Sequence, residues 1–151
     1  MITVEICNRQ DRPFDEDRIR VAAEVVLESH GVRDASVSVA ILDDPSIHQL
    51  NRHHLQHDYP TDVLSFLYSA KGTRLEGEII ASAETADREA DAAGWSMQEE
   101  LVLYVVHGCL HLVGFDDHDE ADRLTMRGEE RRVLELLGIR SDSHVPTPEA
   151  R

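Results

Sequence analysis

The stretch LVLYVVHGCLHLVGFDDH, from Leu101 to His118, includes the most hydrophobic segment of this 151-residue chain, yet it contains three histidines. His107 and His111 are four residues apart, so in a helix they share one face, roughly 6 Å apart along the axis. The residues around them are apolar nearly all round, which predicts a buried helix over about 97–113 at the centre of the fold. A rigid, buried helix of this kind is suited to holding metal ligands.

Outward from this helix, periodicity predicts strands and further helices in the order β-α-β-α-β-β-α-α-α. The fold class is therefore α/β (α+β), with a single small sheet of about four strands packed by helices. We expect one domain over residues 1–140 and a flexible C-terminal tail over 141–151. The strands are expected at about 2–7, 35–42, 62–69 and 75–82, and the other helices at about 15–30, from 44 onward, 83–94 and 120–138.

The composition, with 41% hydrophobic and 30% charged residues, is typical of a soluble globular protein. The net charge of −15 opposes non-specific binding to nucleic acid, so an RNA contact needs a local basic patch or a partner that holds the RNA. The absence of an apolar run of 18 residues argues against a membrane span. Two cysteines, Cys7 and Cys109, do not suggest a disulfide framework, and we expect a cytoplasmic protein.

The three histidines suggest a metal site. Gly114 can end the helix and turn the chain back, so that the following loop returns His118 to His107 and His111. Three protein ligands and one open position are typical of catalytic zinc. The alternative is that His107 and His111 bind no metal and only fill space in the core and at the surface. A protease of the H-E-x-x-H type is disfavoured, because Gly108 stands where the catalytic glutamate would be.

Three segments carry a family resemblance. HGCLHLVGFDDH, residues 107–118, resembles the signature H-G-x-L-H-L-x-G-[YF]-D-H of the YbeY family, which comprises bacterial endoribonucleases and rRNA maturation factors. LNRHHLQHDYPTDVLSF, residues 50–66, resembles the family's L-N-x-x-[FY]-R-x-x-D-x-P-T-[DN]-V-L-S-F. GEIIAS, residues 77–82, resembles its L-G-D-I-x-I-S strand, and the flanking elements match in order.

The resemblance implies a compact α/β fold with one Zn²⁺ per chain, held by three histidines. It also implies a single-strand-specific endoribonuclease that acts in maturation of the 16S rRNA 3′ end and in quality control of the small subunit. The implied partners are rRNA and the small ribosomal subunit. Ribosomal proteins or an assembly GTPase are further candidates. His107 and His111 match the first two ligands, although imidazoles also suit nickel, copper or iron.

This chain departs from the family pattern at two places. The family's third histidine comes ten residues after the first, where this chain has Asp117, and His118 follows one residue later. We expect His118 to be the third ligand, because imidazole matches the family chemistry, with Asp117 as the alternative. The family's arginine, which resembles a phosphate-contacting or charge-stabilising group, aligns with Leu55, and an apolar side chain cannot fill that role. Arg52, one helical turn earlier, is either a replacement for that arginine or an ordinary surface cation.

Other polar residues near these motifs have two interpretations each. With His118 as the ligand, Asp116 and Asp117 either orient an imidazole N–H or are solvated loop residues. The turn before the third strand either lines the metal cleft or merely shapes the chain's entry into the strand; it contains Asp58, Pro60, Thr61, Asp62 and Ser65. We expect Cys109 to fill the core, and His53, His54 and His57 to be solvated.

The leading hypothesis is a zinc-dependent endoribonuclease with His107, His111 and His118 as ligands. A second hypothesis, favoured by the net charge and by Leu55, is a non-catalytic ribosome-assembly factor with a structural zinc. A third, weaker hypothesis is a metallohydrolase with a small-molecule or peptide substrate.

Overall fold

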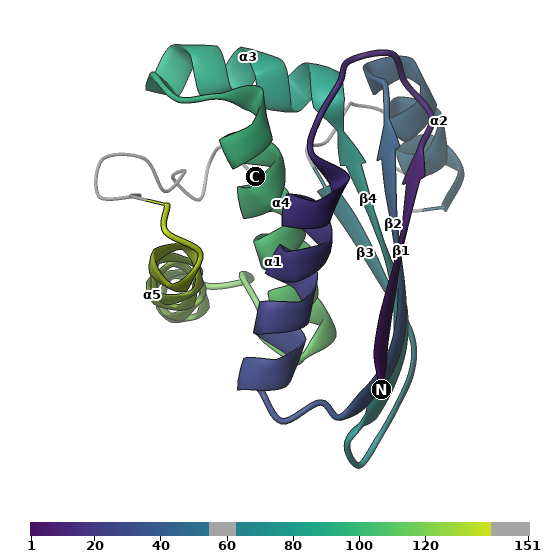
Figure 1. Ribbon diagram of the computed structural model, residues 1–151, viewed down its shortest axis with the longest axis vertical. Helices are drawn as coiled ribbons and strands as arrows, with labels where there is room; N and C mark the ends of the chain where they lie inside the picture. The colour runs from purple at the N-terminus through teal and green to yellow at the C-terminus, as the bar shows by residue number, and fades with distance from the viewer. Residues whose placement is uncertain (55–62, 140–151) are drawn as a thin grey trace.

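A computed structural model describes residues 1–54 and 63–139, with backbone only for 50–54. One four-stranded sheet carries helices on both faces, and the observed element order is the predicted one (Figure 1). The predicted tail, residues 141–151, lies outside the described residues. The elements are β1 (Ile2–Asn8), α1 (Glu16–Ser29), β2 (Asp34–Leu42), α2 (Asp44–His54), β3 (Val63–Lys71), β4 (Arg74–Ser82), α3 (Ala83–Ala93), α4 (Met97–Leu112) and α5 (Glu120–Leu136).

The sheet is mixed, with strand order β1-β2-β4-β3. β1 pairs with β2, and β2 with β4, in parallel; α1 connects the first pair in the chain, and α2 and β3 lie between the strands of the second. β3 and β4 form an antiparallel hairpin that turns at Gly72, whose φ is +59°. Alternate side chains of β2, including Val37, Val39 and Ile41, are buried on the face that α1 and α4 cover. α2 covers one end of the opposite face (Figure 1).

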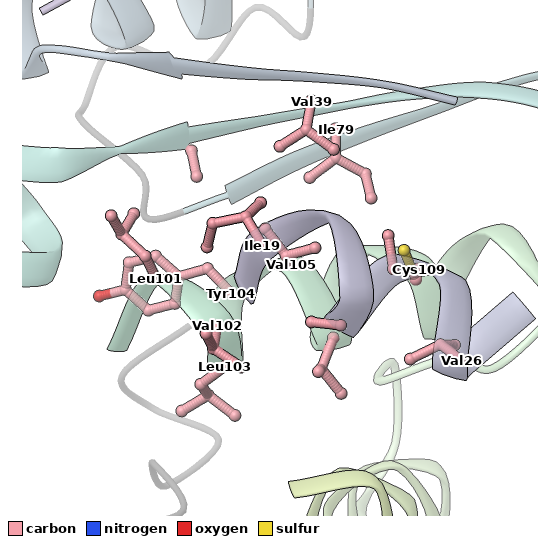
Figure 2. Packing of buried hydrophobic residues seen from close by; sticks show 14 of the residues in the cluster. Ile19, Val26, Val39, Ile79, Leu101, Val102, Leu103, Tyr104, Val105 and Cys109 are labelled. Carbon is pink, nitrogen blue, oxygen red and sulfur yellow. The ribbon is translucent and has the colours of Figure 1, made fainter. Parts of the chain in front are cut away.

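The central position predicted for the apolar helix is confirmed. α4 is buried along nearly its whole length, since the sheet lies on one side, α1 and α3 pack beside it, and α5 lies beyond it from the sheet (Figure 1). Figure 2 shows Val105 and Cys109 of α4 packed among Ile19 of α1 and Ile79 of β4. The expectation that Cys109 fills the core is confirmed, and burial raises the pKa of its thiol to about 12. No helix in the described ranges combines the length and hydropathy needed to span a bilayer.

Local signals fix where α4 begins and ends. A capping box joins Ser96 and Glu99: the Ser96 side chain accepts from the Glu99 backbone N–H, and the Glu99 side chain accepts from the Ser96 backbone N–H. At the other end, Gly114 takes the positive φ of +107° that the sequence predicted for a turn there. Between them, Gly108 lets the helix approach the sheet closely, because a Cβ at this position would lie 2.9 Å from Ile79 Cγ2.

Candidate metal centre

His107 and His111 lie one turn apart near the C-terminal end of α4, as predicted, and their rings meet edge to face. The Nε2 atoms of the two rings are 3.1 Å apart. His107 is buried, whereas the His111 side chain is 26% exposed. The pair therefore has one side in the protein interior and one side open to solvent.

The loop after α4 brings a carboxylate to this pair. Asp117 Oδ2 lies 3.5 Å from His107 Nε2 and 3.4 Å from His111 Nε2. The loop is held by backbone hydrogen bonds from Gly114 to His111 and from Phe115 to Leu110, and the Phe115 ring packs edge-on against His30. These contacts tie the loop to the end of α4 and to the segment that follows α1.

The spacing of the three donor atoms fits one small cation. Donors bonded to a tetrahedral ion at about 2.1 Å lie about 3.4 Å from one another. The observed separations between His107 Nε2, His111 Nε2 and Asp117 Oδ2 are 3.1, 3.4 and 3.5 Å. Among the side chains that the structure describes, in residues 1–49 and 63–139, these three form the one group of histidine, cysteine or acidic residues that could share a metal ion.

The structure does not bring His118, the third ligand preferred from the sequence, into this group. Its side chain is 82% exposed, and its Nε2 lies 3.1 Å from Asp116 Oδ1 on the surface. The alternative, Asp117, faces the histidines instead. The physical reason is that the Gly114 turn and the buried side of Phe115 set the direction of the loop, and only one of the two adjacent side chains faces inward.

Sequence reasoning missed one residue of the site, Glu130 on α5. Glu130 Oε2 lies 2.6 Å from His107 Nδ1, and both side chains are buried. Since an ionised carboxylate can only accept, Nδ1–H is the donor. A signal existed in the sequence: Glu130 falls on the apolar stripe of α5, four residues after Met126 and three before Val133, where a charged residue needs a partner.

The charges around His107 shift three pKa values. Burial alone would lower the pKa of His107, but hydrogen bonds to Asp117 and Glu130 raise it from 6.5 to about 9. The hydrogen bond with His107 outweighs burial at Asp117 and lowers its pKa from 3.8 to about 2. Burial and the neighbouring His107 charge lower the pKa of His111. In metal-free protein, a proton on His107 therefore lies between two carboxylates, where a cation is favoured.

The metal-free protein is expected to lose stability as the pH rises. Because the pKa of His107 is 6.5 when unperturbed and about 9 in the fold, its contribution is complete below about pH 6.5 and is lost as the pH rises through about 9. The loss is on the order of 3 kcal/mol. Asp117, with its lowered pKa, has the opposite dependence: its contribution is present above about pH 3.8 and is lost as the pH falls through about 2.

Urea unfolding of chelator-treated protein between about pH 6 and pH 9.5 measures this loss. The double variant His107→Leu/Glu130→Leu is the control, because it removes the titrating ring without leaving Glu130 buried and unpaired, and it is expected to flatten the alkaline decline. An equal decline in wild type and the double variant would contradict the assignment.

Of the other polar residues that the sequence analysis placed near the site, the structure describes the side chain of Ser65. Ser65 Oγ donates to the Gly108 backbone oxygen and so attaches β3 to α4. The side chains of Arg52, His53 and His54 are not among those described. Other sequence-based candidates lie outside the described residues: Leu55, His57, Asp58, Pro60, Thr61 and Asp62.

Comparison with known proteins places these observations in a family context. The profile of the family described as "Endoribonuclease YbeY" matches residues 5–138. A protein of that name from Rhodopirellula baltica is 48% identical over 120 residues, covering 78% of this chain and 62% of the relative. Those from Geobacter metallireducens and Carboxydothermus hydrogenoformans are 37% and 38% identical, cover 89% of this chain, and are themselves covered to 95% and 97%.

Among solved structures, the solution structure of TM1509 from Thermotoga maritima has a similar fold. The TM-score is 0.60 at 21% sequence identity, and the match covers 99% of this chain and 100% of the other. This likeness concerns the fold.

Proposed function

Because this chain belongs to the endoribonuclease YbeY family, we propose that it is a metal-dependent enzyme that cleaves RNA internally, with the metal ion held by His107, His111 and Asp117. The observation that carries the proposal is the convergence of these three donor atoms at separations that suit one tetrahedral ion. The partial exposure of His111 leaves one side of the cluster accessible to a substrate.

We propose zinc as the ion, one per chain. Two imidazoles and a carboxylate form a known ligand set of catalytic zinc sites, which keep a further position open. When bound, such an ion supplies a Lewis acid and a water of lowered pKa for phosphodiester cleavage. Asp117 and Glu130 contribute negative charge on either side of His107, which favours a divalent cation over an empty pair of imidazoles.

The three proposed ligands have different surroundings and therefore different roles. His107, enclosed by α4 and α5, fixes the buried side of the cluster, and the apolar helix around it excludes water there. His111 and Asp117, both partly exposed, form the side from which a phosphate would approach.

We propose the 3′ end of 16S rRNA as the substrate, in single-stranded form, and the small ribosomal subunit as the setting of cleavage and quality control in the cytoplasm. The family resemblance supports this assignment. The net charge of −15 supports a role for ribosomal proteins or an assembly GTPase in holding the RNA near the site, because the chain as a whole repels phosphate.

A second candidate is a non-catalytic ribosome-assembly factor in which zinc is structural. The net charge favours it, as does Leu55 at the position of the family's arginine. This candidate predicts that metal removal lowers stability while metal-loaded protein leaves RNA intact.

Cleavage of a labelled 16S rRNA 3′-end fragment tests the proposed function. Wild-type protein loaded with about one zinc per chain is expected to cut the single-stranded fragment and to leave its fully duplex form intact. Chelator-treated protein and His111→Ala are expected to be inactive, and re-addition of zinc is expected to restore wild type alone. Intact RNA with metal-loaded, folded wild type would instead support the assembly-factor role.

A further inference from the structure

Glu130 stands out among the described residues outside the proposed ligand set. The residue is 2% exposed, and it belongs to α5, which comes after the metal loop in the chain. A buried carboxylate is costly unless it is paired and hydrogen-bonded. Its partner is Nδ1 of His107, at 2.6 Å, across the interface between α4 and α5.

The choice of nitrogen decides what this contact does. An imidazole that binds a metal has a lone pair on one nitrogen and a proton on the other. Glu130 accepts the proton of Nδ1, so the lone pair falls on Nε2. Nε2 is the atom that faces His111 and Asp117. The contact thus selects the tautomer and also stops the ring from rotating.

We propose that Glu130 is the positioning residue of the metal centre: from α5 it holds His107 in the tautomer and orientation that bind the ion, and its charge strengthens the binding. The inference rests on the proposed function, because it presupposes that His107, His111 and Asp117 hold a metal.

Charge and orientation are separable at this position. Glu130→Gln keeps the size of the side chain and an oxygen that can accept from Nδ1–H, but removes the charge. Glu130→Leu removes both the charge and the acceptor and leaves an apolar side chain of similar size among Met126, Val133 and Leu134. A positioning role predicts graded loss of metal affinity across the two variants, in the order wild type, Gln, Leu.

Glu130 also has a matched control in the chain. Glu100 is a buried glutamate on the same helix as the histidines, about two turns before His107, and its Oε1 accepts from Trp95 Nε1. Glu100→Gln therefore removes a buried negative charge from α4 without touching the metal cluster. It is expected to change the free energy of unfolding but not the metal affinity.

The experiment measures zinc dissociation constants by competition with a chromophoric chelator, together with the visible spectrum of the Co²⁺-substituted protein and the urea stability of the metal-free form. We expect about 10-fold weaker binding for Glu130→Gln and about 100-fold for Glu130→Leu, the range typical of groups that orient a ligand. The Co²⁺ spectrum is expected to persist in Glu130→Gln and to change in Glu130→Leu.

The outcomes distinguish the alternatives. If both variants bind zinc as wild type does while their stability changes, Glu130 is only a helix–helix contact and the inference is overturned. If Glu130→Leu does not fold, Glu130→Gln alone decides, because a structural role predicts unchanged affinity for it. If Glu100→Gln weakens binding equally, the effect is one of buried charge in general and the inference fails. If wild type itself binds no metal, both the proposed function and the inference about Glu130 fail.

Discussion

Asp117→Ala is expected to weaken zinc binding by roughly 100-fold or more and to abolish RNA cleavage, whereas His118→Ala is expected to change neither. Asp117 Oδ2 lies within 3.5 Å of both histidine Nε2 atoms, so its removal leaves two ligands. The His118 ring is on the surface beside Asp116. Elemental analysis of purified protein, coupled to cleavage of the 16S rRNA 3′-end fragment, measures both effects.

Two further variants sharpen this comparison. Asp116→Ala removes the surface partner of His118 and is expected to retain metal and cleavage. Asp117→His places an imidazole ten residues after His107, as in the family signature, and is expected to keep metal bound. If His118→Ala loses the metal and Asp117→Ala does not, the loop adopts another arrangement around the ion, with His118 as the third ligand.

Gly108→Val is expected to lower the free energy of unfolding by about 3 kcal/mol and to weaken metal binding at the same time. A Cβ at this position would lie 2.9 Å from Ile79 Cγ2 and 3.0 Å from Ser65 Oγ, so a branched side chain forces α4 away from the sheet. Since His107 is the preceding residue, the displacement also moves the ligand. Valine's better helix propensity recovers only about 0.5 kcal/mol.

Gly128→Ala is the matched control for this prediction. Gly128 lies inside α5, and a Cβ added there would meet no neighbouring side chain or element within 4 Å, so alanine is expected to stabilise the protein by about 1 kcal/mol. Urea unfolding of the two variants beside wild type, with and without zinc, gives both values. A Gly108→Val protein as stable as wild type would show that the helix–sheet contact is not tight.

The order of elements could be predicted from the sequence because each element carries its own periodicity. Alternation marks β1 and β2, and the turn-prone residues around Gly72 separate β3 from β4. The pairing order β1-β2-β4-β3 could not be read in this way, since it depends on which strands the connecting segments bring together in space.

In the candidate site, too, the parts that lie within one element could be predicted from the sequence. His107 and His111 belong to one helix, and a spacing of four residues places them on one face whatever the rest of the chain does. The apolar surroundings that predict a central helix are equally local. Local sequence patterns alone therefore predict the element order, the buried position of α4 and the placement of His107 and His111 on one helix face.

Which other groups reach the histidine pair depends on how distant elements pack together. Asp117 and His118 are neighbours in a loop, and the direction of each side chain depends on the Gly114 turn and on the contact of Phe115 with His30, which follows the distant α1. Glu130 meets His107 across 23 residues of chain, because α5 packs on α4. Periodicity within α5 indicates that Glu130 needs a buried partner but not which residue that partner is, since such contacts form only when separate elements bury their apolar faces against each other.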